Sequence, residues 1–200
     1  MMNRKTELNL IVGVNGSGKT TFIDQQIVSN SEKSLVVTPD DMEWKNLPEI
    51  PLSEIRTFTG NGKIIYRGPD TIEYIKKNYS GGNLIMDDAM AYLNHQTPDT
   101  MRYIYIRRRH FGIDVYIVAH GLRQVPPQCF TFSSWLILFN SVENFRNRKN
   151  EIQPELFEKI ITAQSRISNN VVNGKPYYYE IILLDTQIRG QYEYDRKNHR

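Results

Sequence analysis

The segment GVNGSGKT, at residues 13–20, has the composition and spacing of a loop that binds phosphate groups. It fits the pattern GxxxxGK[ST], and it lies between an apolar run at residues 8–14 and a helix predicted from Lys19. In such a loop the glycines let backbone N–H groups point at phosphates, the lysine bridges the β- and γ-phosphates, and the next hydroxyl coordinates magnesium. The residues predicted to contact a nucleotide are Gly13, Asn15, Gly16, Ser17, Gly18, Lys19, Thr20 and Thr21.

Two adjacent acids end a second apolar run, at residues 83–88. A carboxylate at the end of a buried strand can reach a magnesium ion held by Thr20, directly or through water, so Asp87 is the second predicted metal ligand. Its neighbour Asp88 is placed to polarise an attacking water and is predicted to be catalytic. Either acid could instead cap the helix that follows. The intact phosphate loop upstream favours the catalytic interpretation.

Further polar candidates follow the acids. His120 ends the apolar run at residues 113–119 and would lie beside the γ-phosphate if this strand runs between those of the other two motifs. It could sense the phosphate or orient water, or it could make only a structural hydrogen bond. Three arginines at residues 107–109 come late in a predicted helix, where cations favour the C-terminus for electrostatic reasons alone. One of them, or Arg123, could instead reach a neighbouring subunit's nucleotide as an arginine finger.

The elements that must position these residues alternate along the chain. Core strands are predicted at residues 8–14, 34–38, 83–88, 113–119 and 135–139, with a short extra strand at 64–66. Helices are predicted from Lys19, at 70–79 with Asp70 as N-cap, at 98–111 after a Thr97 cap, and at 154–167. Nearly all-apolar strands that alternate with helices favour an α/β fold with a mainly parallel sheet covered on both faces. Residues 177–185 and 191–195 predict a closing C-terminal β-hairpin.

The bulk properties fit one globular unit. The chain has 200 residues, 40% hydrophobic and 24% charged, which predicts a single domain over residues 1–200. The net charge is only +3, but basic runs at residues 107–110, 146–149 and 196–200 could meet phosphate backbones or simply be solvated. Cys129 is the only cysteine, which excludes an intrachain disulfide and favours the cytoplasm. No apolar run approaches the ~20 residues of a membrane span, so none is expected.

The order of the motifs resembles the FtsK/HerA superfamily of ring-forming DNA pumps, and it is most similar to the small genome-packaging ATPases of tailless icosahedral viruses with internal membranes. Beside the phosphate loop, the resemblance rests on LIMDDAMAYLNH, RRRHFGIDVYIVAHGLRQVP, SSWLILFNSVENF and YYYEIILLDTQIRGQYEYD. It implies ATP and Mg²⁺ as ligands, a homo-oligomeric ring, and DNA held through its backbone. A capsid portal or vertex protein is the implied docking partner, and the host cytoplasm or the virion is the implied location.

The resemblance also assigns roles, with some departures. Where the family has Asp-Glu after its second strand, this chain has Asp87 and Asp88, and where the family sensor is usually glutamine, this chain has His120. The family's trans-acting arginine matches Arg109, with an alignment uncertainty of one place towards Arg108.

Two other function classes remain open from the residues alone. A small P-loop kinase of this length could phosphorylate a nucleoside or metabolite and use residues 107–109 as a lid. An assembly ATPase of filamentous phages, related to zonula occludens toxin, is the other, although that group is usually membrane-anchored. Adjacent acids and a polar residue at a strand end favour activation of water over kinase chemistry. ATP is preferred over GTP because the chain has no NKxD guanine motif.

Overall fold

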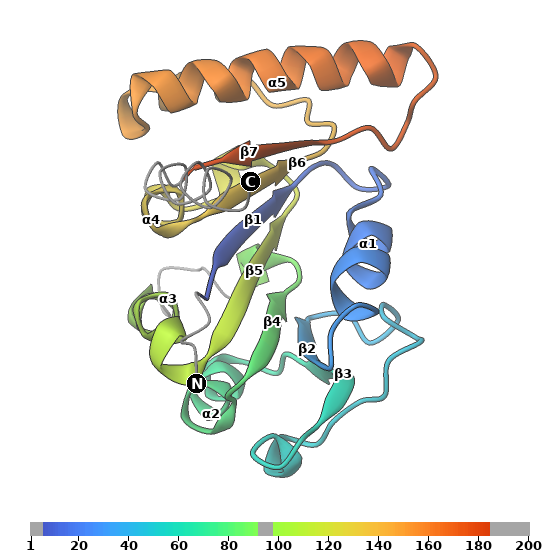
Figure 1. Ribbon diagram of the computed structural model, residues 1–200, viewed down its shortest axis with the longest axis vertical. Helices are drawn as coiled ribbons and strands as arrows, with labels where there is room; N and C mark the ends of the chain where they lie inside the picture. The colour runs from blue at the N-terminus through green and yellow to red at the C-terminus, as the bar shows by residue number, and fades with distance from the viewer. Residues whose placement is uncertain (1–5, 92–97, 185–200) are drawn as a thin grey trace, which may run out of the picture.

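A seven-stranded sheet forms the centre of the computed structural model, which describes residues 6–91 and 98–184 (Figure 1). The strand order is β3-β2-β4-β5-β1-β6-β7, and every neighbouring pair is parallel except β6 and β7. The strands are β1 Leu8–Val12, β2 Lys33–Thr38, β3 Gly60–Ile65, β4 Gly82–Met86, β5 Ile113–Ala119, β6 Trp135–Leu138 and β7 Glu180–Leu183.

Helices cover both faces of this sheet (Figure 1). The α-helices are α1 Lys19–Phe22, α2 Pro69–Asn78, α3 Pro98–Phe111, α4 Pro127–Phe132 and α5 Pro154–Val172. Helix α1 continues directly into a π-helical segment, η1 Ile23–Val28. Short 3₁₀ segments are η2 Leu52–Glu54, η3 Ala89–Ala91, η4 Leu122–Gln124 and η5 Phe145–Glu151.

The apolar strands feed two hydrophobic cores because successive side chains of a strand point to opposite faces. In β1, Leu8, Leu10 and Val12 join a core that includes residues of α2, α3, α4 and α5, whereas Ile11 joins a second core with α1 and η1. Every residue of β1 is buried, as expected for a parallel strand covered on both faces. The predicted class, an α/β fold with a mainly parallel sheet, is confirmed.

The structure corrects several element boundaries, among them the short strand predicted at 64–66, which is β3 and begins at Gly60. Asp70 is not the N-cap of α2: the helix begins at Pro69, Gly68 is the N-cap, and Asp70 lies in the first turn. The residue before a proline at the first helical position must leave the helical backbone region, and Gly68 does so with a φ of 116°. Helix α5 ends at Val172 rather than at residue 167.

The predicted C-terminal hairpin is described only in part. Strand β7 lies within its first half and pairs antiparallel with β6. The second half, residues 191–195, and the predicted Thr97 cap lie outside the described residues. Within the described ranges, no helix is long and apolar enough to cross a membrane.

The position of β5 in the sheet determines where the site forms. Strand β5 lies between β4 and β1, with Val115 level with both Leu84 and Leu8. Parallel strands in register end at one edge of the sheet, so the loops after β1, β4 and β5 meet there. His120 was predicted to approach the phosphate loop and the two acids if its strand lay between theirs, and β5 meets this condition.

Candidate active site

The phosphate loop follows β1 and is anchored to both neighbouring strands. The backbone N–H of Gly13 donates to the carbonyl of Ala119 (3.2 Å), and that of Val14 donates to the carbonyl of Asn140 (2.8 Å). A Cβ at Gly13 would lie 2.5 Å from the Cβ of Phe139, so only glycine permits this approach. Gly18, with a φ of 97°, turns the loop into α1 in the left-handed region that favours glycine.

Lys19 is buried and its ammonium lies inside the loop. Its Nζ donates to the carbonyl oxygens of Gly13 (2.7 Å) and Val14 (3.0 Å). Burial lowers the pKa of Lys19, while the negative charges of Asp87, Glu43 and Asp88 act in the opposite direction. A cation that donates to neutral carbonyls, with acids nearby, can change partners when phosphate oxygens arrive.

Asp87 lies directly after β4 and is also buried. Its Oδ2 accepts a hydrogen bond from the indole Nε1 of Trp44 (2.7 Å), and its Oδ1 accepts one from the backbone N–H of Asp88 (3.2 Å). Trp44, in the loop after β2, is itself buried and adopts a φ of 53°. The carboxylate is therefore fixed in orientation. Trp44 could not be predicted as a partner of Asp87, because the two residues are 43 positions apart in the chain.

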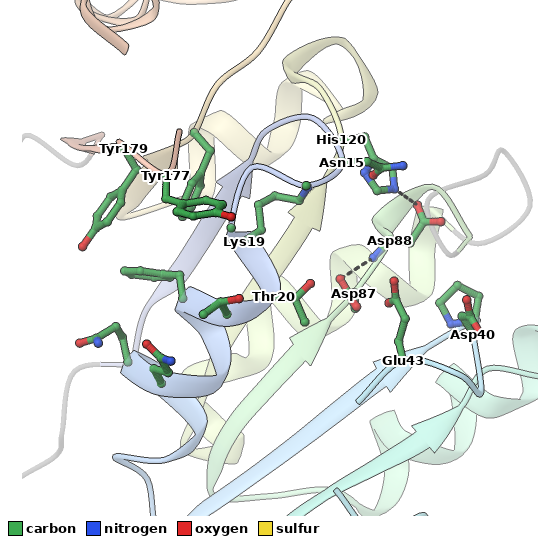
Figure 2. A pocket seen from close by; sticks show the side chains of 18 residues that line it. Asn15, Lys19, Thr20, Asp40, Glu43, Asp87, Asp88, His120, Tyr177 and Tyr179 are labelled. Atoms are coloured by element: carbon green, nitrogen blue, oxygen red, sulfur yellow. Dashed lines mark hydrogen bonds and ion pairs between the residues drawn. The ribbon is translucent and has the colours of Figure 1, made fainter. Parts of the chain in front are cut away.

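Asp88 and His120 lie next to each other at one end of the cavity (Figure 2). The Nε2 of His120 lies 3.7 Å from the Oδ1 of Asp88, and both side chains are partly exposed. The backbone N–H of His120 donates to the Oε1 of Gln124 (3.0 Å), which holds the residue at the end of β5. Asp88 has a φ of 51°, an uncommon conformation for a non-glycine residue and one that Asp tolerates better than most. The structure thus brings the second acid and the predicted sensor together.

Glu43 is a further acid that the sequence analysis did not select. It lines the same cavity, and Figure 2 shows it extending towards Asp87. Burial raises the pKa of Glu43 to about 7, with further contributions from its hydrogen bond to Asp87 and from the negative charges of Asp87, Asp40 and Asp88. Its proline-containing loop has no periodic pattern that would have indicated this position.

The oxygen atoms present fit a magnesium ion shared with phosphate. Thr20 and Asp87 lie on facing sides of the cavity (Figure 2). The described residues contain no group of three or more His, Cys, Asp or Glu that could hold a metal by itself. Magnesium in nucleotide sites uses one or two protein oxygens and completes its shell with phosphate and water, so a hydroxyl and one carboxylate are a suitable donor set.

The cavity itself has a volume of about 860 Å³, within the range of small-molecule sites. Most of the residues that were predicted to contact a nucleotide line this cavity, and Asp87, Asp88 and His120 line it as well. Tyr177 and Tyr179, which precede β7, line the same cavity and were not selected from the sequence.

The predicted arginines separate into different environments. Arg108 is buried, and its Nη1 donates to the carbonyl of Tyr105 (2.6 Å), so it stabilises α3. Arg109 is exposed at the C-terminus of α3, next to the start of β5 and therefore at the sheet edge opposite the phosphate loop. Arg123 is exposed in η4, after β5, on the same edge as the loop. The basic run at 146–149 also divides, because Arg148 is buried.

Together, the sheet order and the loop define the P-loop nucleoside triphosphatase fold. Among solved structures, the genome-packaging NTPase B204 from Sulfolobus turreted icosahedral virus 2 is similar in its complex with AMP: TM-score 0.68, 19% identity, covering 94% of this chain and 96% of that one. Its complex with AMPPCP gives a TM-score of 0.69 at 18% identity over 91% and 94% of the two chains. The DNA-packaging ATPase B204 from Sulfolobus turreted icosahedral virus gives 0.67 at 17% identity over 90% and 94%.

These likenesses show the fold. No protein-family model matches the sequence, and no curated protein sequence matches it significantly.

Proposed function

We propose that this chain is an ATP-hydrolysing motor that moves DNA into a viral capsid as a homo-oligomeric ring. The observation that carries the proposal is the position of β5 between β1 and β4, which sets His120 against Asp88 beside the phosphate loop. The fold likeness to packaging NTPases over nearly the whole chain supports the same conclusion.

The residues of the site suit hydrolysis of a phosphoanhydride. Lys19 exchanges its carbonyl partners for the β- and γ-phosphate oxygens and offsets their charge. Thr20 and Asp87 would hold a magnesium ion, which would supply neutralisation of the charge that develops during transfer. Asp88 orients the attacking water and accepts its proton, and His120, 3.7 Å away, helps to orient the same water and senses the γ-phosphate.

The first test separates hydrolase from kinase. Phosphate release from ATP is measured with and without double-stranded DNA, and the same preparation is screened for phosphorylation of nucleosides and metabolites. DNA-stimulated release with no phosphorylated product supports the motor. A phosphorylated small molecule would replace it with the kinase. Lys19→Ala is the control for contaminating ATPases.

Arg109 is proposed to act on the neighbouring subunit's nucleotide. Strand β5 separates it from its own phosphate loop, and seven residues of strand span about 20 Å. An exposed cation at that distance can reach only another protomer's site, where such a finger is worth ~10³-fold or more in rate.

A mixing experiment tests this assignment. Arg109→Ala subunits and Lys19→Ala subunits, each inactive alone, are combined. Recovered activity supports action in trans, because some interfaces then pair an intact Arg109 with an intact loop. Full activity of Arg109→Ala alone, with loss in Arg123→Ala, would move the role to Arg123. A protein that stays monomeric with DNA and ATP would contradict the ring.

DNA contact is proposed to be electrostatic, through the phosphate backbone. The exposed members of the basic runs, such as Arg107, Arg109, Arg146 and Lys149, are candidates. Affinity for DNA should then fall steeply between ~50 and 200 mM salt. Binding that does not change over this range would argue against backbone contact. Docking to a portal or vertex protein of the capsid belongs to the same proposal.

A further inference from the structure

The end of the cavity away from the acids is aromatic. Phe22, Tyr177 and Tyr179 line the cavity, together with two glutamines of the π-helical segment, Gln25 and Gln26. In Figure 2 the two labelled tyrosines lie on the opposite side of Lys19 and Thr20 from Asp88 and His120. A polar end suits the phosphates of a nucleotide, and an aromatic end suits its flat base.

The chain path explains why tyrosines occur there. Strand β7 is antiparallel to β6, with Glu180 level with Leu138 at the carboxyl end of β6. The segment before β7 therefore lies at the same sheet edge as the phosphate loop, which begins at Gly13.

Tyr179 anchors this segment. Its ring centroid lies 4.9 Å from that of Phe22 and 5.1 Å from that of Phe139, so it packs against α1 and the residue after β6. Tyr178 packs instead against the larger core. Tyr177 lies in the turn just before, which is closed by the hydrogen bond from the backbone N–H of Tyr178 to the carbonyl of Lys175 (3.2 Å), and its side chain lines the same cavity as that of Tyr179.

Tyr177 lies against the phosphate loop and is largely exposed. Its Cδ1 is 3.1 Å from the position that a Cβ at Gly18 would take, yet its side chain is exposed. A tyrosine held against a loop but left exposed offers a flat apolar surface, on which a nucleobase can stack.

The direction of the triphosphate leads to the same place. Its β- and γ-phosphates belong beside Lys19 and the acids, so the nucleoside must leave the loop over the first turns of α1 and η1. Gln25 and Gln26 line the cavity there and carry amides that can bond the polar edge of a base. A π-helical turn is rare and occurs often at functional sites.

We propose that Tyr177 is the stacking residue of a nucleobase subsite for purines, in a segment that Tyr179 anchors to the fold. This inference rests on the proposed function only in taking the ligand to be a nucleoside triphosphate. It requires neither DNA nor a ring.

The test compares two ligands that differ only in having a nucleoside. Isothermal titration calorimetry measures binding of Mg-ATP and of Mg-tripolyphosphate to the unmodified protein, Tyr177→Ala and Tyr177→Phe. The Ala variant should bind ATP about tenfold or more weakly, while its affinity for tripolyphosphate changes less than about twofold. The Phe variant keeps the ring and should bind both ligands normally. Tyr74→Ala, which removes an exposed tyrosine of α2, is the matched control.

Base selectivity gives a second readout. The unmodified protein should bind ATP more tightly than UTP, because a purine has the larger stacking surface, and the difference should shrink in Tyr177→Ala. Equal loss of ATP and tripolyphosphate binding in Tyr177→Ala would overturn the subsite and leave Tyr177 as a support of the loop. Unchanged ATP binding would overturn it outright. Hydrolysis that DNA does not stimulate would reject the motor but not the subsite, whereas an unmodified protein that binds neither ligand would reject both.

Discussion

Lys19 and Arg148 are both buried cations, and their surroundings differ. Arg148 donates through Nη1 to the carbonyls of Leu122 (2.7 Å) and Val125 (2.5 Å), through Nε to Glu151 (2.7 Å), and lies over the ring of Phe130. Within the part of the chain that the structure describes, Lys19 donates hydrogen bonds only to two carbonyls of its own loop, and the nearby acids form no ion pair with it. The arginine has its partners within the fold, whereas the lysine is arranged for a partner from outside. Burial alone therefore does not distinguish a structural charge from a functional one.

The largest effect that this comparison predicts is on turnover. Lys19→Ala should lower ATP hydrolysis at least ~10³-fold, because no other loop residue supplies positive charge between the β- and γ-phosphates. The free energy of unfolding should change by less than about 1 kcal/mol, since the cost of burying the ammonium disappears with it. Phosphate-release assays and urea titrations measure the two quantities. Lys45→Ala, at an exposed position, is the control, and normal turnover in Lys19→Ala would refute the site.

Arg148→Met should show the reverse pattern. It leaves two carbonyls without their donor, and the free energy of unfolding should fall by about 3 kcal/mol. Turnover per folded molecule should stay within about twofold. Arg146→Met, in the same 3₁₀ segment but exposed, should change stability by less than about 0.5 kcal/mol. If Arg148→Met lost activity without losing stability, the division between the two cations would be wrong.

The two acids beside Lys19 should respond differently from each other. Asp88→Asn should keep Mg-ATP binding but lower turnover ~100-fold, the scale of lost base catalysis. Asp87→Asn should mainly raise the magnesium concentration required. Asp70→Asn, on the surface of α2, serves as control. Normal kinetics in both variants would mean that these acids only shape the turn after β4.

Trp44 allows a finer test of the same end of the site. Trp44→Phe keeps an aromatic ring in the second core but removes the indole donor to Asp87. We expect the half-saturating Mg²⁺ concentration for hydrolysis to rise about tenfold, with little change in kcat at saturating Mg²⁺. Trp135→Phe, which removes an indole donor to Glu7 far from the acids, should leave the Mg²⁺ requirement unchanged. A fall in kcat alone would show that Trp44 acts on something other than the metal ligand.

The smallest effect concerns Cys129, near Arg148. Burial raises the pKa of this thiol from 9.0 to about 11, although Tyr105 and Arg148 partly oppose the shift. Because the charged form is disfavoured in the folded state, the thiol lowers the stability of the fold as pH rises from 9.0 towards about 11. At pH 8, a thiol reagent should modify the folded protein slowly and the unfolded protein fast. Rapid modification of the folded protein would show that the region around Arg148 opens readily.

Motifs with a fixed local spacing were the part of the site that the sequence could predict. The loop at 13–20, the acids after β4 and the strand before His120 each carry their signal within a few residues. The five core strands followed from apolar runs, because a parallel strand covered on both faces is apolar at nearly every position. The roles assigned to single residues at the site stay predictions.

The parts that the sequence could not predict depend on contacts between distant residues. Trp44 meets Asp87 across 43 residues, and Tyr177 lies against Gly18 although the two are far apart in the sequence. Neither lies in a periodic segment. The position of β5 between β4 and β1 could be stated only as a condition for His120 to reach the site. An apolar run predicts a strand but does not specify which strands lie beside it. Asp70 was misassigned because Asp is a common N-cap, whereas Pro69 at the first helical position moved the cap to Gly68.

The central place of β1 in the sheet has a consequence for synthesis on the ribosome. Strand β1 pairs with β5 and β6. Leu8 therefore cannot pair until Val115 has been synthesised, and Leu10 cannot pair with Leu136 until that residue has been synthesised. At roughly 5–20 residues per second, the strand that carries the phosphate loop remains without either neighbour for about 5 to 20 seconds after it is made. During that interval an apolar segment is open to wrong pairings, and the nascent chain is then most dependent on protection by chaperones. The first functional motif to be translated is thus among the last to be folded.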